Sequence, residues 1–325
     1  MRCTGKKTVL AGSILACLLS LSACGADDAV ISYEKETYNA DLYRAELFAE
    51  DLCVTSQDVA VDGFTGDSTL HGAGLFNVTD GQVVYGQHLF DRLYPASTTK
   101  VLTALVAIKN SNLDDVVTVS STASASSFSW EASVAGIQTG DQVTMRDLLY
   151  GLMLPSGNDS AVAIAEYIGG TEEHFMEMVN EEAKALMATG THFVTPNGLH
   201  DEDHYTTVYD LYLIFNECIK YEEFVNIISA DSYTAQITGA DGTVRSVTWE
   251  PTSFYARGEA ALPTGAAVIG GKTGFTDDAG NCLVLLDQAS DGDYYISIVM
   301  GAEEKPILYD DMTAMIDLIP AQQQE

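Results

Sequence analysis

Strand-like segments occur near both ends of this chain and enclose a long stretch with helical periodicity. Residues 74–78 and 83–85 flank an Asp-Gly pair and predict two strands joined by a tight turn. Residues 283–286 and 294–300 are apolar and predict two further strands, and residues 233–248 alternate like strands. This order is not an alternating βαβ pattern, so it argues against a parallel doubly wound sheet.

The middle of the chain carries the apolar spacing of helices. Residues 97–109 predict a helix with one apolar side, and Pro95 lies just before them, where a helix start tolerates proline. The stretch 114–200 is mostly helical by pattern, and a last apolar stripe covers residues 308–319. We therefore expect a mixed α/β fold: one antiparallel sheet built from both ends, flanked by helices, with an inserted helical subdomain. Within and after the middle stretch, helices are predicted over 144–150, 161–168, 172–187 and 207–221.

The composition excludes two classes of protein. An apolar fraction of 46% supports a sizeable core and rules out a wholly disordered chain. Acidic residues outnumber Lys and Arg by 47 to 15, for a net charge of −32. Nucleic acid is therefore an unsuitable partner, because affinity for phosphates comes from clustered Lys and Arg. The same charge argues against docking on anionic lipid by surface electrostatics.

The N-terminus has the pattern of an export signal. Arg2, Lys6 and Lys7 precede an apolar run over residues 9–21, which is too short to span a bilayer. Small residues and Cys24 follow, in an arrangement that resembles the lipobox of bacterial lipoproteins. The resemblance implies a signal peptide over 1–23, a lipidated Cys24 and an extracytoplasmic protein anchored to the membrane by its N-terminal lipid. The alternative is an ordinary signal peptide with an incidental cysteine.

Three cysteines remain beyond Cys24. They are Cys53, Cys218 and Cys282, and the sequence does not decide whether two of them pair. Cys218 and Cys282 lie in apolar stretches, which is typical of small buried hydrophobic residues. Their spacing does not suggest a structural zinc site.

A Ser-x-x-Lys tetrapeptide opens the first predicted helix. Positions i and i+3 share a helix face, so the Ser97 hydroxyl and the Lys100 amine can be neighbours. Serine becomes a nucleophile when a base takes its proton. Lysine can act as that base when burial or nearby cations lower its pKa from about 10.4 toward 7–8.

Two further motifs supply polar groups for a substrate. Ser156-Gly157-Asn158 is a turn sequence whose hydroxyl and amide could relay a proton and hold a substrate amide. Gly271-Lys272-Thr273-Gly274 is strand-like, and its lysine and threonine offer a cation and a hydroxyl to an anion. Each motif is common alone, but the three in this order are the set of penicillin-binding proteins and β-lactamases.

With these motifs the chain resembles the serine-type D-Ala-D-Ala carboxypeptidases, the low-molecular-mass penicillin-binding proteins of peptidase family S11. The similarity runs from about residue 70 to 319 and includes residues 94–100, 146–159 and 270–280. It implies the β-lactamase/penicillin-binding-protein transpeptidase-like fold and a catalytic domain over 70–325. Residues 24–69 would then be the lipidated Cys24, an acidic tether and an N-terminal extension. The chain ends too soon after Lys272 for the C-terminal β domain of the longer members, so we expect that domain to be missing.

The resemblance also implies a role for each motif residue. Ser97 would attack the carbonyl between the last two D-alanines of a peptidoglycan stem peptide, with Lys100 as base. Ser156, bonded to Lys100 or Lys272, would pass the proton to the leaving D-alanine. Water would release the acyl-enzyme, whereas β-lactams would acylate Ser97 and remain. The implied binding groups are Asn158 for the peptide amide, Lys272, Thr273 and Gly274 around the terminal carboxylate, and the backbone N–H groups of Ser97 and Phe275 as oxyanion hole.

Other functions are compatible with these motifs. D,D-endopeptidase activity on crosslinks uses the same site. A class A β-lactamase shares the motifs but needs a Glu-x-x-Leu-Asn segment, and only Glu177-Met178-Val179-Asn180 approaches it. A non-catalytic lipoprotein that binds wall peptides or β-lactams is a further alternative. His200 and His204 are four residues apart, as in some zinc sites, but lie in an acidic loop. We expect neither a metal nor a cofactor.

Overall fold

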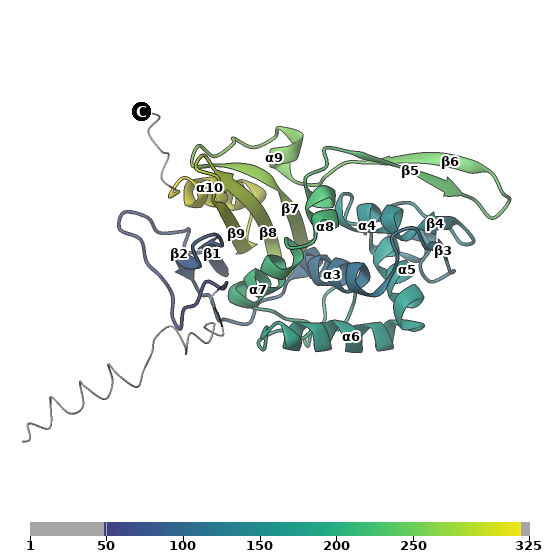
Figure 1. Ribbon diagram of the computed structural model, residues 1–325, viewed down its shortest axis with the longest axis horizontal. Helices are drawn as coiled ribbons and strands as arrows, with labels where there is room; N and C mark the ends of the chain where they lie inside the picture. The colour runs from purple at the N-terminus through teal and green to yellow at the C-terminus, as the bar shows by residue number, and fades with distance from the viewer. Residues whose placement is uncertain (1–48, 50, 320–325) are drawn as a thin grey trace, which may run out of the picture. The chain divides into compact units, whose positions relative to one another are not determined.

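Both ends of the chain contribute strands to one five-stranded antiparallel sheet. The computed structural model describes residue 49 and residues 51–319, and residues from Asp51 onward form one unit. The strand order is β2-β1-β9-β8-β7, and β1 lies beside β9 with Phe76 opposite Ile296 (Figure 1). The predicted pairing of early and late segments is therefore confirmed. The strands are β1 (Gly72–Asn77), β2 (Gln82–Gln87), β7 (Ala266–Thr276), β8 (Gly280–Ala289) and β9 (Tyr294–Ala302).

Helices cover both faces of this sheet. On β8, Leu283 and Leu285 point toward α10 (Lys305–Ile316), whereas Val284 and Leu286 point into the helical core. The middle of a strand that is buried on both faces favours continuous apolar residues, which explains the run 283–286. The predicted stripe at the C-terminus is buried against the sheet. The helices of the other side are α3 (Lys100–Asn110), α4 (Met145–Met153), α5 (Asn158–Gly169), α6 (Glu172–Ala185), α7 (Val208–Cys218) and α8 (Glu222–Ile228).

A second, four-stranded sheet corrects the expectation of a single one. The predicted strands over 233–248 are β5 (Tyr233–Thr238) and β6 (Val244–Trp249), which form a hairpin. This hairpin joins β4 (Gln142–Thr144) and β3 (Val116–Thr118) instead of the main sheet. The stretch 114–200 is thus less helical than predicted. Strands of three residues are too short to reveal a period of two, so the pattern could not identify them.

Residues 51–69 pack against the main sheet and α7. Val59 exchanges backbone hydrogen bonds with Gly86 of β2, and the Cys53 N–H donates to the Tyr212 hydroxyl at 2.7 Å. Cys53, Cys218 and Cys282 are all free and buried, which confirms the prediction for Cys218 and Cys282 as small buried hydrophobic residues.

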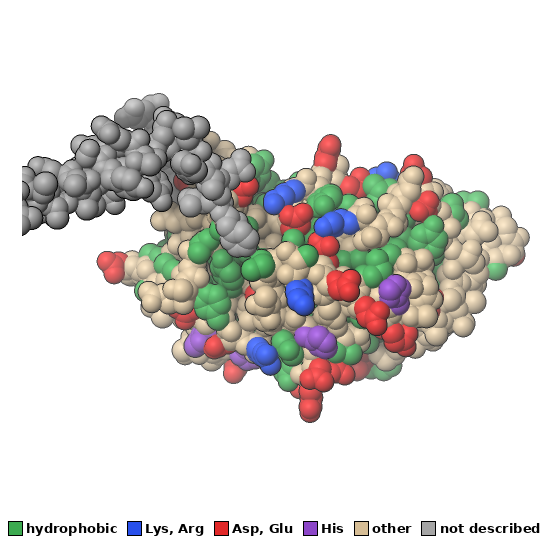
Figure 2. Space-filling model, turned by 60° about the horizontal axis from the view of Figure 1, so that its bottom comes forward, with side chains coloured by type: hydrophobic (Ala, Val, Ile, Leu, Met, Phe, Trp, Pro, Cys, Tyr) green, Lys and Arg blue, Asp and Glu red, His purple; other side chains and the backbone are tan. Residues whose placement is uncertain are grey.

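The predicted signal peptide, Cys24 and the acidic tether lie outside the described residues. Among residues 51–319, no helix is long and apolar enough to cross a membrane. Carboxylates predominate over lysine and arginine on the face in Figure 2, in keeping with the large negative net charge.

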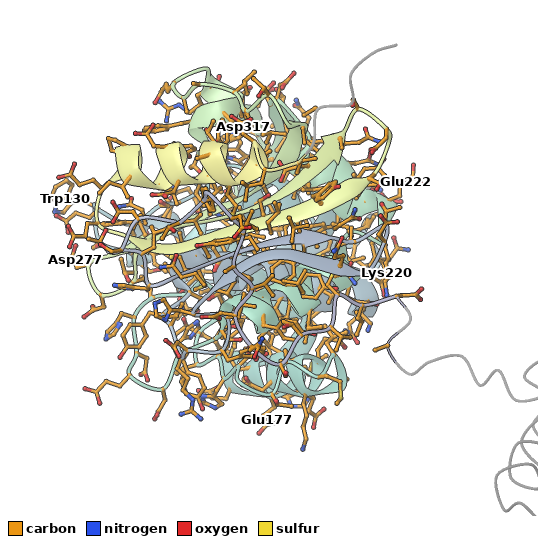
Figure 3. All side chains as sticks on the ribbon, turned by 90° about the vertical axis from the view of Figure 1, so that its left-hand side faces the viewer. Trp130, Glu177, Lys220, Glu222, Asp277 and Asp317 are labelled. Carbon is orange, nitrogen blue, oxygen red and sulfur yellow. The ribbon has the colours of Figure 1, made fainter. Side chains whose placement is uncertain are left out.

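Replacing Phe76 tests the packing between β1 and α7. Its ring is fully buried and stacks on Tyr212 with centroids 4.2 Å apart. Phe76→Ala should lower the free energy of unfolding by about 3–5 kcal/mol, because a cavity remains. Urea unfolding measures this, with Trp130→Ala as the matched aromatic control. Trp130 projects from the surface and is 91% exposed, so its loss should cost less than about 0.5 kcal/mol (Figure 3). Equal losses in the two variants would contradict the packing described.

Candidate active site

Ser97 lies in a 3-10 turn, Ala96–Thr99, that leads directly into α3. The sequence predicted that the α-helix begins at Ser97, but it begins at Lys100, after this tighter turn. In a 3-10 turn residues i and i+3 eclipse each other, so the two side chains still meet. The Lys100 Nζ lies 2.9 Å from the Ser97 Oγ.

The Lys100 amine is fully buried and held by two further oxygen atoms. Its Nζ lies 2.8 Å from the Asn158 Oδ1 and 2.7 Å from the Asn197 carbonyl. Burial, together with the nearby charge of Lys272, holds the pKa of Lys100 well below its usual value, and Asp159 acts in the opposite direction. A neutral amine has two hydrogens and one lone pair. With its hydrogens on Asn158 and Asn197, its lone pair is available to Ser97.

Ser156 and Lys272 form a second serine–lysine pair. Ser156 lies in the turn between α4 and α5 with φ of 62°, and its Oγ accepts from the Lys272 Nζ at 2.9 Å. The sequence left its partner open between two lysines, and the structure selects Lys272. The Lys272 Nζ also donates to the Thr273 carbonyl at 2.7 Å. Burial lowers the pKa of Lys272 to about 7.

A cleft of about 340 Å³ opens over these residues. Its lining includes Ser97, Ser156, Asn158, Thr273, Gly274 and Phe275. Lys100 and Lys272 lie beneath this surface, almost completely shielded from solvent. The structure therefore brings every predicted motif residue to one place, with the two hydroxyls at the surface and the two amines below.

Strand β7 passes very close to the nucleophile turn at Gly274. A Cβ on that residue would lie 3.0 Å from both the Pro95 carbonyl oxygen and the Ser97 nitrogen. Glycine thus lets the strand edge approach the Ser97 N–H. The next residue, Phe275, brings its backbone to the same end of the cleft.

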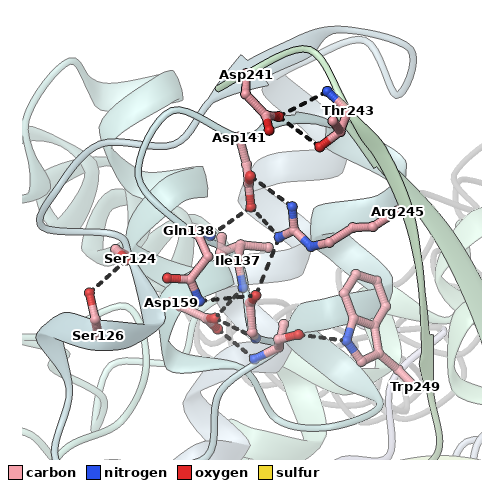
Figure 4. Close-up of polar contacts among 12 residues, drawn as sticks. Ser124, Ser126, Ile137, Gln138, Asp141, Asp159, Asp241, Thr243, Arg245 and Trp249 are labelled. Carbon is pink, nitrogen blue, oxygen red and sulfur yellow. Dashed lines mark hydrogen bonds and ion pairs between the residues drawn. The ribbon is translucent and has the colours of Figure 1, made fainter. Parts of the chain in front are cut away.

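The opposite wall is held by a buried carboxylate. Asp159 follows Asn158 on α5 and accepts the backbone N–H groups of Ala135, Gly136 and Ile137 at 2.7–3.2 Å (Figure 4). The Asn158 N–H donates to the Ser133 carbonyl at 2.8 Å, so this loop is fixed on both sides of the motif. Burial raises the pKa of Asp159, although four backbone N–H groups oppose the shift.

Sequence reasoning missed several groups of this site. The Asn197 carbonyl, which contacts Lys100, is a backbone atom and leaves no residue-type signal. Thr252 bonds the Thr273 hydroxyl at 2.5 Å, and Glu131 and Lys305 line the cleft. These residues lie in loops or at a helix start outside the three motifs. The structure also shows why residue 198 is glycine, since a Cβ there would lie 1.9 Å from the Ala96 carbonyl oxygen.

His200 and His204 have different surroundings. His204 is buried against Thr99, whereas the His200 Nδ1 lies 3.5 Å from a carboxylate oxygen of Asp278. Within residues 51–319, no three His, Cys, Asp or Glu side chains are grouped as metal ligands.

Comparison with known proteins agrees with this geometry. A sequence model of the family Peptidase_S11, D-alanyl-D-alanine carboxypeptidase, matches residues 69–304. The D-alanyl-D-alanine carboxypeptidase DacF of Bacillus subtilis is 31% identical over 75% of this chain and 60% of its own length. The D-alanyl-D-alanine carboxypeptidase of Streptomyces sp. strain K15 is 31% identical over 76% of this chain and 85% of its own length. The chain therefore spans less than two thirds of the Bacillus relative.

Solved structures share the fold. The Streptomyces K15 DD-transpeptidase has a TM-score of 0.70 at 31% identity and covers 78% of this chain and 99% of its own. Penicillin-binding protein 5 from Haemophilus influenzae has a TM-score of 0.67 at 26% identity, over 79% of this chain and 71% of its own. The predicted fold class is thus confirmed, and the chain belongs to the Peptidase_S11 family of D-alanyl-D-alanine carboxypeptidases.

Proposed function

We propose that this protein is a serine D,D-peptidase that removes the terminal D-alanine from peptidoglycan stem peptides. The observation that carries the proposal is the contact between the Ser97 Oγ and the buried Lys100 amine, 2.9 Å apart beneath an open cleft. Family membership indicates the substrate class. The geometry supports a nucleophile with an adjacent base, which is what acyl transfer requires.

Acylation begins when neutral Lys100 takes the Ser97 proton. The Ser97 Oγ then attacks the carbonyl carbon between the two D-alanines, and a tetrahedral oxyanion forms. Its charge faces the backbone N–H groups of Ser97 and Phe275, each worth about 3 kcal/mol of transition-state stabilisation. The Asn158 Oδ1 is occupied by Lys100, so its Nδ2 hydrogens are the ones left for the carbonyl of the stem peptide.

The leaving D-alanine needs a proton and a site for its carboxylate. As the C–N bond breaks, the Ser156 hydroxyl, which lines the cleft, passes its proton to the departing nitrogen and takes in exchange the proton that Lys100 removed from Ser97. The Thr273 hydroxyl, also on the cleft surface, binds the carboxylate directly. Lys272 contributes its positive charge from beneath, through its contacts with Ser156 and Thr273.

The fate of the acyl-enzyme separates the neighbouring activities. Attack by water gives a carboxypeptidase, or an endopeptidase if the acyl donor is a crosslink. Attack by an amine gives a transpeptidase, and the similar Streptomyces K15 structure carries that name. Acyl transfer to an amine is therefore the second candidate function. β-Lactams would acylate Ser97 by the same first step.

Product analysis tests the main proposal. Wild-type protein should bind fluorescent penicillin covalently and release D-alanine from a pentapeptide stem. Ser97→Ala should lose both activities, and Lys100→Ala should slow acylation by at least about a hundredfold. Lys220→Ala is the matched control, because this lysine is exposed and pairs with Glu217. A wild-type protein without label would contradict the proposal.

A crosslinked dimer and a pentapeptide with an added amine, assayed in parallel, separate endopeptidase and transpeptidase from carboxypeptidase.

The two lysines predict a bell-shaped pH profile of kcat/KM. Acylation needs neutral Lys100, so the rate should rise as pH increases through its lowered pKa. Carboxylate binding needs protonated Lys272, so the rate should fall as pH increases through about 7. Lys272→Arg keeps its charge at every pH and should remove the alkaline limb. An alkaline limb that persists unchanged in this variant would assign it to another group.

We further propose that the enzyme is extracytoplasmic and anchored through lipid on Cys24. The supporting observations are the basic start, the apolar run and the small residues before Cys24. Cells grown with radioactive palmitate should label the wild-type protein, and Cys24→Ser should abolish the label. Equal labelling of the two forms would exclude Cys24 as the lipid site.

A further inference from the structure

His204 lies behind the nucleophile turn and makes contacts with both of its ring nitrogens. The ring is buried and stacks on Phe193 with centroids 4.7 Å apart. Its Nε2 lies 2.8 Å from the Thr99 Oγ1. Its Nδ1 lies 3.0 and 3.3 Å from the backbone nitrogens of Val194 and Thr195.

These contacts fix the position of the imidazole proton. Backbone N–H groups can only donate, so the His204 Nδ1 must accept and carries no hydrogen. The proton of the neutral ring is therefore on Nε2, which donates to the Thr99 hydroxyl. That hydroxyl in turn donates to the Ala96 carbonyl oxygen at 2.8 Å. The two hydrogen bonds thus follow one direction: His204 donates to Thr99, and Thr99 donates to Ala96.

Ala96 needs such support because its backbone is strained. Its φ is 48°, in the left-handed region that residues with a Cβ rarely adopt. This conformation persists only where the surroundings hold it. The Ala96 carbonyl is confined on its other side by Gly198, where a Cβ would lie 1.9 Å from the oxygen. Ser97 is the next residue in the chain, so the backbone conformation of Ala96 determines where the Ser97 side chain points.

The other nitrogen of the ring fixes the segment that holds Lys100. Val194 and Thr195 lead directly to Pro196 and Asn197. The Pro196 carbonyl accepts from the Thr103 hydroxyl on α3, and the Asn197 carbonyl accepts from the Lys100 Nζ, both at 2.7 Å. One imidazole thus connects the turn that carries the nucleophile with the loop that orients its base.

We propose that neutral, Nε2-protonated His204 is a positioning residue that holds Ser97 and Lys100 in register for acylation. This inference rests on the proposed function, because acylation of Ser97 is the step it supports. His204 does not touch the substrate, since it acts through Thr99 on one side and through residues 194–197 on the other.

The ionisation of the ring agrees with this role. Burial lowers the pKa of His204 to about 4, and the charged groups that face it are Asp201, His192 and His200. The ring is therefore neutral at neutral pH. Protonation would place an Nδ1–H opposite two N–H donors. Because the unfolded chain binds this proton more tightly, the contribution of His204 to stability is lost as pH falls from about 6.5 toward 4.

Acylation kinetics with fluorescent penicillin test the inference. His204→Asn keeps an acceptor near Val194 but cannot reach Thr99, and Thr99→Val breaks the same link from the other end. Thr99→Val also removes the hydrogen bond to the Ala96 carbonyl. Each variant should slow the first-order acylation step at least about tenfold, the usual effect of a lost hydrogen bond, and leave the non-covalent binding constant within twofold. Thr99→Ser should restore the wild-type rate. The double variant should be no slower than the slower single variant.

The outcomes separate this inference from the proposed function. His174→Asn, an exposed histidine on α6, is the matched control and should acylate at the wild-type rate. If the wild-type protein is labelled and folded His204→Asn and Thr99→Val acylate at the wild-type rate, the inference is overturned and the proposed function is not. Effects that multiply in the double variant also overturn the inference, because they indicate two independent actions. Circular dichroism melts check folding, and the Thr99→Val and Thr99→Ser pair carries the test if His204→Asn does not fold.

Discussion

Two lysine amines lie beneath one cleft, almost without contact with solvent. Moving an ammonium charge out of water costs several kcal/mol, so a buried lysine must be hydrogen-bonded or lose its proton. Lys100 does both, because three oxygen atoms surround an amine whose pKa is strongly lowered. Lys272 follows the same logic with two acceptors, the Ser156 Oγ at 2.9 Å and the Thr273 carbonyl at 2.7 Å. The proposed chemistry depends on this burial, since an exposed lysine would stay protonated at neutral pH.

The architecture supplies the atoms that this burial requires from four separate places in the chain. The 3-10 turn before α3 provides Ser97, the α4–α5 turn provides Ser156 and Asn158, and β7 provides Lys272. The Asn197 carbonyl comes from a loop fixed by His204. Backbone strain occurs at two of these points, because Ala96 and Ser156 both have positive φ values. Such strain is stable only where packing on all sides resists relaxation, which the buried core around α3 and β8 provides.

The sequence alone predicted the parts of this account that depend on residue type and local period. The pairing of the chain's ends, the apolar stripe on α10 and the meeting of Ser97 with Lys100 all follow from spacing. The second sheet did not, because β3 and β4 have three residues each and their pairing with β5 is non-local. The partner of Ser156 was also open, since either lysine satisfies the motif. The Asn197 carbonyl was not predictable, because every residue has a carbonyl and only the folded chain decides which one faces Lys100.

Direct titration of the Lys100 amine tests the central claim most directly. The protein can be labelled with ¹³C at the lysine Cε, and the Lys100 signal assigned by its absence in Lys100→Met. The Cε shift is then followed by NMR as pH is raised. The account predicts a transition for Lys100 far below the ordinary lysine value of about 10.4. A Lys100 signal that titrates near 10.4 would mean that the amine is protonated at neutral pH, and would contradict its role as the base that activates Ser97.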